Sequence, residues 1–140
     1  MFDAIKKWFA NRHKLPEAKM AEFRSEGRLA VGEYVKAKLT YLNYKAPGKR
    51  FGYKKVWFRS HVALTKARFF ATVYGRLSID VLLADERAKK MKFAVENEFL
   101  LVTIDAGLFY PEWSGTLEYR FAVPEPQQFV DGFQQEIGRQ

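Results

Sequence analysis

Basic and aromatic side chains are interleaved in residues 49–59 of this 140-residue chain. Ammonium and guanidinium groups attract phosphates, whereas exposed aromatic rings suit either the headgroup layer of a membrane or stacking on single-stranded bases. A structural alternative is that Val56 and Phe58 fill a core while Trp57 packs locally. The candidate anion-binding side chains are six cations in and beside this segment: Lys45, Lys49, Arg50, Lys54, Lys55 and Arg59.

Charge is distributed unevenly along the chain, whose formal net charge is +8. Residues 1–70 hold 17 basic and 5 acidic side chains, whereas residues 71–140 hold 7 basic and 11 acidic ones. Between Glu33 and Asp80 there are 11 Lys and Arg residues and no acidic residue. Such a one-sided field attracts phospholipid headgroups, nucleic acid or an acidic protein, although solubility alone is the simpler explanation.

Residue types that support catalysis are scarce. The chain has no cysteine, which excludes thiolate zinc sites and cysteine nucleophiles, and His13 and His61 alone do not build a metal site. Ser60 and His61 are adjacent on an expected strand, so their side chains would face opposite sides. No nucleophile-elbow, phosphate-loop or dinucleotide motif occurs. We therefore expect no enzymatic activity, no cofactor and no metal. Five acidic residues are most simply solvated: Asp80 and, in expected loops, Asp85, Glu86, Asp105 and Glu112.

The chain has no apolar run near the roughly 18 residues of a membrane-spanning helix. Lys6, Lys7 and Arg12 interrupt the N-terminal segment where a secretory signal would be apolar. The lack of cysteine suits a reducing compartment. We expect a cytoplasmic location, with peripheral attachment at the inner face of the membrane as an extension of that expectation.

The first fifteen residues, Met1–Leu15, have the period of an amphipathic basic helix. Three alternatives are open: the helix packs on its own domain, on a second subunit, or on a bilayer. The candidate membrane- or partner-facing side chains are Phe2, Ile5, Trp8 and Phe9.

Two helices and seven strands are expected beyond that segment. Pro16 fits the first turn of a short helix over residues 17–25, and Gly27 fits the position just after its end. From Glu33 the apolar period changes to two, which indicates strands. Apolar residues four apart follow Pro126 and predict a final helix. The expected strands cover residues 33–45, 51–64, 69–74, 77–83, 91–95, 99–104 and 116–123.

Three segments resemble bacterial members of the pleckstrin-homology-like family. The first is His61–Phe70, where a strand, Leu64-Thr65, a turn and Arg68 precede another strand. The others are Tyr41–Phe51 and Trp113–Leu117, and the likeness covers roughly residues 30–138. The resemblance implies a binding module. Eukaryotic phosphoinositide binders of this family carry cations on the first two strands and the loop between them, a region that here also includes Lys36 and Lys38. Their usual final arginine is missing after Lys54-Lys55, which favours general anion attraction over specific inositol-phosphate recognition.

The sequence therefore predicts an α+β, pleckstrin-homology-like fold. We expect a seven-stranded bent antiparallel sheet, or partly open barrel, with a C-terminal capping helix. Residues 1–27 would form an N-terminal amphipathic helical extension and residues 28–140 the domain. The leading functional hypothesis is a non-catalytic binding module at an anionic membrane surface. A protein-interaction or self-assembly module using the N-terminal helix is one alternative, with a homo-oligomer as an open outcome, and nucleic-acid binding is a second, less favoured one.

Overall fold

The structure, a computed structural model, describes residues 15–73 and 76–140, and residues 76–78 are described by their backbone alone. The predicted helix over Met1–Leu15 therefore lies almost wholly outside the described residues. The same holds for its four candidate facing residues Phe2, Ile5, Trp8 and Phe9.

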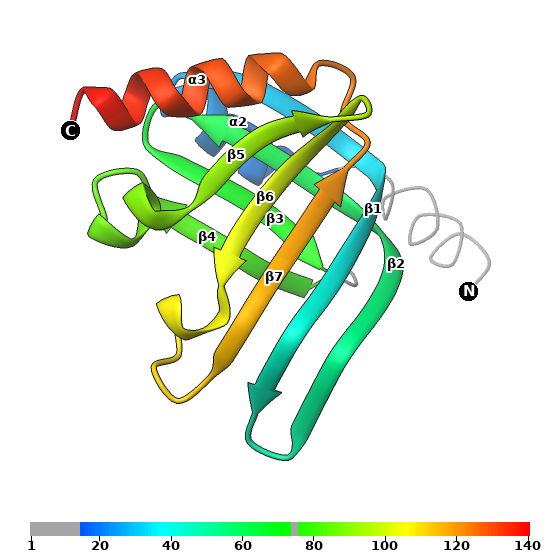
Figure 1. Cartoon of the computed structure of the whole chain (residues 1–140). Helices are drawn as coiled ribbons and strands as arrows, with labels where there is room; N and C mark the ends of the chain where they lie inside the picture. The colour runs from blue at the N-terminus through cyan, green and yellow to red at the C-terminus, as the bar shows by residue number, and fades with distance from the viewer. Residues whose placement is uncertain (1–14, 74–75) are drawn as a thin grey trace, which may run out of the picture.

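Within the described residues, seven strands form one antiparallel sheet that curls into a half-barrel, with helices packed on it (Figure 1). The order across the sheet is β4-β3-β2-β1-β7-β6-β5. This confirms the predicted α+β fold class and is consistent with a pleckstrin-homology-like fold. The elements are α2 (Glu17–Ser25), β1 (Arg28–Ala46), β2 (Lys49–Thr65), β3 (Arg68–Val73), β4 (Arg76–Leu82), β5 (Lys92–Glu96), β6 (Phe99–Asp105), β7 (Ser114–Phe121), α3 (Pro126–Gly138) and the 3₁₀ turns η1 (Glu86–Lys90) and η2 (Ala106–Leu108).

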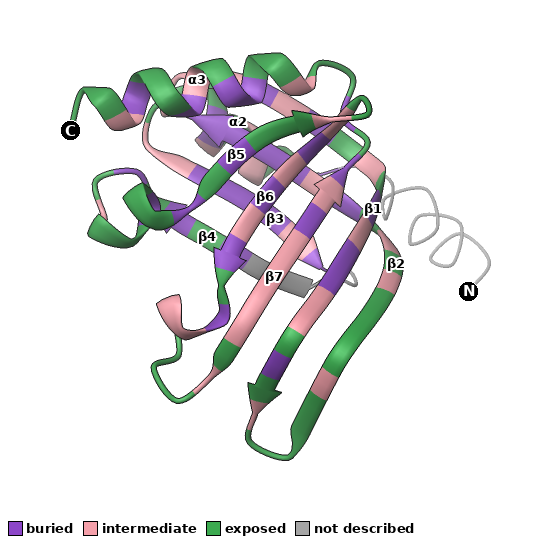
Figure 2. Cartoon of the chain, in the orientation of Figure 1, coloured by how far each residue is buried: buried purple, intermediate pink, exposed green. Residues whose placement is uncertain are grey.

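The β1–β2 hairpin is much longer than the strands beside it. β1 has 19 residues and β2 has 17, whereas β3 has only 6. β2 pairs with β3 only through residues 62–64, so the part of the hairpin nearer its turn projects past β3 and β4. Figure 1 shows this projection, and Figure 2 shows that much of it is exposed.

β1 alternates as predicted, with Ala37 and Leu39 buried and Val35 and Tyr41 half-buried on the core side. The predicted start at Glu33 was wrong, because β1 begins at Arg28. A register shift between Gly32 and Val35 interrupts the apolar alternation, so the first residues of β1 do not continue the period of two that follows.

The main core lies between the inner face of the sheet and α3. Phe133 of α3 stacks on Phe93 of β5 with ring centroids 3.8 Å apart, and Phe93 meets Phe69 of β3 at 4.9 Å. Gly132 brings α3 close to β2, since a Cβ there would lie 3.0 Å from the Leu64 side chain. The predicted apolar stripe of this helix is confirmed: Phe129, Val130 and Phe133 are buried and Ile137 is partly buried.

Helix α2 packs on the opposite, outer face of the sheet. Its Phe23 is fully buried against Phe70, with ring centroids 5.2 Å apart. The predicted bounds 17–25 are confirmed, although Pro16 occupies the N-cap position before the first turn. Gly27 follows the helix with φ +80°, a conformation that glycine adopts at little cost.

An ion cluster centred on Arg68 joins α2 to β3 and β4. The Arg68 guanidinium donates to Glu26 (Nη2–Oε2 2.7 Å) and to Asp80 (Nη1–Oδ1 3.1 Å), and lies 3.4 Å from Glu22. Hydrogen bonding to Glu26 is the main reason that the pKa of Arg68 is raised. The side chains of Arg68 and Glu26 are only 19% and 16% exposed, so this cluster is partly shielded from water.

Asp85-Glu86-Arg87 was expected to be a loop, but the short 3₁₀ turn η1 occupies Glu86–Lys90. The Asp85 side chain caps it by accepting a hydrogen bond from the Arg87 backbone N–H. A turn of five residues has too few positions to show a helical period.

Candidate anion-binding face

The outer face of the β1–β2 hairpin follows from the register of the two strands. Residues paired across antiparallel strands share a face of the sheet. Ala37 pairs with Phe58 on the inner face. The pairs next to this one along the strands, and every second pair beyond them, therefore face outward. These outward pairs are Lys36–Arg59, Lys38–Trp57, Thr40–Lys55 and Leu42–Tyr53.

Trp57 is the centre of this face. Its side chain is 52% exposed, and the Nζ atoms of Lys36 and Lys38 lie 4.7 Å and 5.2 Å from the ring centroid. A tryptophan ring attracts ammonium groups through its quadrupole, which lets two like charges sit beside one exposed ring. Val56 and Phe58 are half-buried on the inner face and do not fill the core, although Phe58 packs against it, whereas Trp57 is exposed.

A second exposed ring lies nearer the turn. Tyr53 is 61% exposed, and the Lys55 Nζ lies 5.4 Å from its centroid. At the other end of the face, the Arg59 guanidinium lies 5.6 Å from the Tyr34 ring and donates to the Tyr34 carbonyl at 3.4 Å. Basic and aromatic groups thus alternate along the outward face of β2, from Arg59 through Trp57 and Lys55 to Tyr53.

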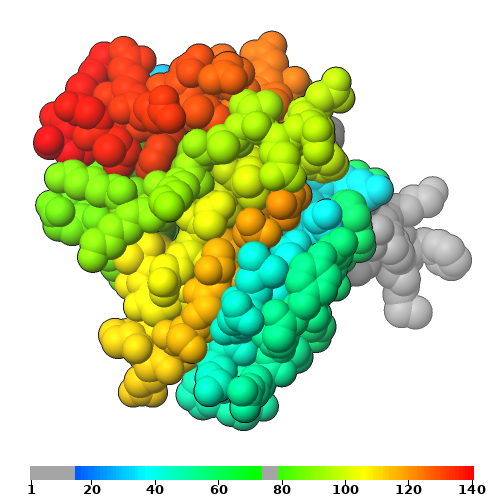
Figure 3. All heavy atoms as spheres, viewed as in Figure 1, coloured from blue at the N-terminus to red at the C-terminus, as the bar shows by residue number. Residues whose placement is uncertain are grey.

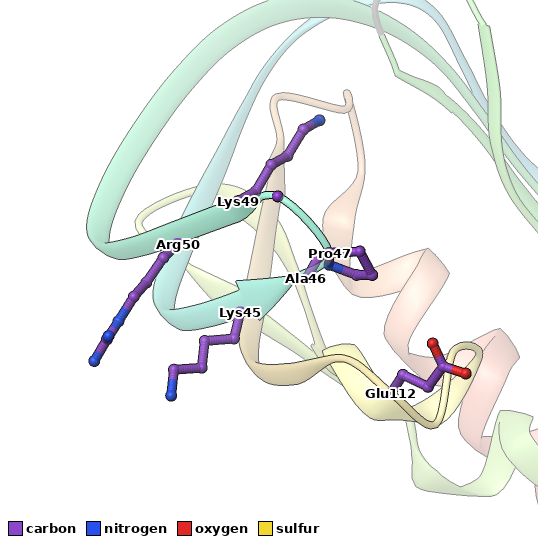
Figure 4. A pocket seen from close by; sticks show the side chains of 7 residues that line it. Lys45, Ala46, Pro47, Lys49, Arg50 and Glu112 are labelled. Atoms are coloured by element: carbon purple, nitrogen blue, oxygen red, sulfur yellow. The ribbon is translucent and has the colours of Figure 1, made fainter.

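The alternation of β1 reverses before the turn. Asn43 has φ +51°, and the pairing with β7 shifts between Leu42 and Lys45. As a result Tyr44 turns to the same side as Tyr41, with ring centroids 4.9 Å apart, and Lys45 turns outward. Figure 4 shows the paired Lys45 and Arg50 extending together on one side of the turn, while Lys49 extends to the other.

The six cations predicted from the sequence therefore divide between two faces. Lys45, Arg50, Lys55 and Arg59 lie outward, where Lys36 and Lys38 join them; we call these six residues the outer basic strip. Lys49 and Lys54 lie on the inner side, where the Lys54 Nζ is 4.3 Å from the Phe51 ring centroid. In the space-filling view, β1 and β2 form one continuous band next to β7 (Figure 3).

Lys36 and Lys38 were not among the six candidates. The signal that finds them is the register counted from the turn at Pro47-Gly48, which places Lys38 opposite Trp57. Charge density alone favoured the residues nearest the turn, because cations are most frequent there.

No carboxylate of the described residues forms an ion pair with the outer basic strip. By contrast, Arg120 on neighbouring β7 pairs with Glu96 (Nε–Oε1 2.8 Å) and Glu118. The hydrogen bond from Arg120 is the main reason that the pKa of Glu96 is lowered, with a smaller contribution from Lys38.

One polar atom in the middle of the face has no hydrogen-bond partner among the described residues, the Oγ1 of Thr40. Thr40 is buried beside its two strand partners, Lys55 on β2 and Glu118 on β7.

Ser60 and His61 have structural roles. The Ser60 hydroxyl donates to the Thr72 carbonyl at 2.6 Å, and the His61 Nδ1 accepts from the Tyr34 backbone N–H at 3.0 Å. These contacts hold the irregular stretch of β1 and the β2–β3 pairing. In residues 15–73 and 76–140, no cluster of three or more metal-ligating side chains occurs and no helix is long and apolar enough to cross a membrane.

No protein-family model matches the chain, and a search of curated proteins found no match.

Proposed function

We propose that this chain is a non-catalytic binding module that associates peripherally with an anionic membrane surface through its outer basic strip. The observation that supports this most is Trp57, an exposed ring flanked by the ammonium groups of Lys36 and Lys38. Tryptophan and tyrosine are favoured at the depth of lipid headgroups, and the lysines beside them would meet the lipid phosphates.

The charge of the strip is sufficient for reversible association. Each basic residue close to an anionic leaflet contributes about 1 kcal/mol. Six engaged residues would give about 6 kcal/mol, which corresponds to a Kd of roughly tens of micromolar. Salt would weaken this attraction, since the Debye length is only about 8 Å at physiological ionic strength.

A second signal would come from residues 1–15. The predicted amphipathic helix would insert Phe2, Ile5, Trp8 and Phe9 as an apolar anchor. Stable peripheral binding usually requires two such weak signals together.

The contacts at Trp57 favour a lipid surface over single-stranded nucleic acid. Base stacking needs a free ring face, and here two ammonium groups lie within 4.7 Å and 5.2 Å of the ring centroid. A stacked base would have to displace these ammonium groups from the ring, whereas a lipid phosphate could bind them where they lie.

Vesicle flotation of the full chain tests the proposal. We expect binding to vesicles containing phosphatidylglycerol, little binding to pure phosphatidylcholine, and a loss of binding as salt rises or when residues 1–15 are deleted. No flotation under any condition would refute the proposal. A dimer that depends on residues 1–15, without lipid binding, would instead support the protein-interaction alternative. Retention on single-stranded DNA at physiological salt that exceeds retention on vesicles would support the nucleic-acid alternative.

A further inference from the structure

A concave surface lies on the inner side of the same hairpin, opposite the outer basic strip. It is a cavity of about 680 Å³ between the inner faces of β1, β6 and β7, strand β4 and the η2–β7 loop. This size is within the range of about 300–1,000 Å³ that is common for small-molecule sites. The outer basic strip contributes no side chain to it.

The cavity exists because the sheet does not close. β4 and β5 are the two edges of the sheet in the described residues. The inner face of β1 beyond Leu39 extends past the short strands β3 and β4. No described strand pairs across the gap between β4 and β5.

The floor of the cavity is apolar. Leu39, Ile79, Val81 and Ile104 line it, and each is at most 4% exposed. Rings line its rim: Trp113 stacks on Tyr110 at 4.1 Å and meets Tyr44 at 6.0 Å. Tyr110, which also lines the cavity, is 55% exposed. An apolar ligand body would pack against this floor and would bury surface mainly on the more exposed lining side chains Tyr41, Tyr110 and Leu117.

The charged groups at the cavity differ in how they are partnered. Asp80 accepts hydrogen bonds from Arg68, and Asp105 accepts one from the Gly107 backbone N–H at 2.7 Å. Arg87 is held by Asp85, whose pKa its hydrogen bonds lower to about 2.

Lys49 is different. It lines the cavity and forms no ion pair with any described carboxylate, so its ammonium group is available to a ligand. A ligand's anionic end would therefore be favoured near the hairpin turn.

We propose that this cavity binds a single-chain amphiphile, with an apolar body on the floor and an anionic head, such as a carboxylate, at Lys49. The site is on the opposite side of the hairpin from the outer basic strip. The inference is therefore independent of the proposed membrane association and is tested without vesicles.

Calorimetric titration of the chain with dodecanoate, below the micellar concentration of dodecanoate, tests this site. We expect saturable 1:1 binding, and little binding of dodecyltrimethylammonium, which has the same chain and the opposite charge. Lys49→Gln should weaken dodecanoate binding about fivefold, as expected for one exposed charge contact. The matched control Arg50→Gln changes the adjacent cation on the other side of the turn and should leave the affinity unchanged.

A second variant tests the apolar lining of the cavity. Leu117→Trp enlarges a half-buried side chain that lines the cavity and should abolish binding, while the far-ultraviolet spectrum reports whether the variant is folded. The proposal would be overturned by the absence of saturable binding to the parent chain. Equal affinity for the cationic amphiphile, or equal effects of Lys49→Gln and Arg50→Gln, would also overturn it.

Discussion

Replacing Arg68 by methionine should destabilise the fold far more than removing an exposed ion pair. The guanidinium donates to Glu26 through Nε at 2.9 Å and Nη2 at 2.7 Å, and to Asp80 through Nη1 at 3.1 Å. Exposed pairs contribute about 0.2–1 kcal/mol, whereas breaking a buried pair costs about 3–5 kcal/mol. With Arg68 only 19% exposed and several charge-assisted bonds lost, we expect Arg68→Met to cost about 2–3 kcal/mol.

Arg24→Met is the matched control. It removes an ion pair within α2, Arg24–Glu17 at 2.7 Å, whose side chains are 51% and 82% exposed. We expect this change to cost less than about 0.5 kcal/mol. Urea unfolding followed by circular dichroism measures both values, and Arg68→Met should also lower the Tm by about 8 °C. Equal costs for the two variants would show that the cluster does not hold α2 on the sheet.

Three further outcomes follow from the structure. Gly115→Ala should cost about 2–4 kcal/mol in urea unfolding, because φ is +104° and a Cβ would lie 2.5 Å from a backbone carbonyl oxygen of β1, whereas Gly52→Ala, with open space around it, should be nearly neutral. Thr40→Val should leave stability unchanged or raise it by up to about 1 kcal/mol, since the lost hydroxyl has no partner among the described residues; a cost above 1 kcal/mol would reveal one. The lowered pKa of Glu96 implies stability that is present above the ordinary value of 4.5 and is lost as the pH falls through the folded value. Arg120→Met should raise the pKa of Glu96 towards that ordinary value in an NMR titration, and an unchanged pKa would contradict the role of the hydrogen bond.

Much of the fold could be predicted because its signals are local. Pro16 and Gly27 bracket α2, and alternating apolar residues mark the strands that follow. The sequence could not show how β1 begins, because the irregular stretch between Gly32 and Val35 breaks the alternation on which the prediction depends.

The candidate site was predicted in composition but not in geometry. Strict alternation from Tyr41 would place Lys45 on the inner face. The positive φ of Asn43 turns Lys45 outward, and only the backbone conformation reveals this. The adjacent Lys54 and Lys55 must face opposite sides of a strand, so their separation could have been inferred from the period of two.

Those two adjacent lysines offer the most direct test of the membrane proposal. Lys54→Glu and Lys55→Glu change the net charge equally, but only Lys55 belongs to the outer basic strip. Each charge reversal on the contacting face should cost about 2 kcal/mol, one for the lost attraction and one for the new repulsion. We therefore predict that Lys55→Glu weakens binding to phosphatidylglycerol vesicles about thirtyfold, and Lys54→Glu less than about fivefold. Equal losses for both variants, or a greater loss for Lys54→Glu, would contradict the proposal that the outer face of the hairpin meets the membrane.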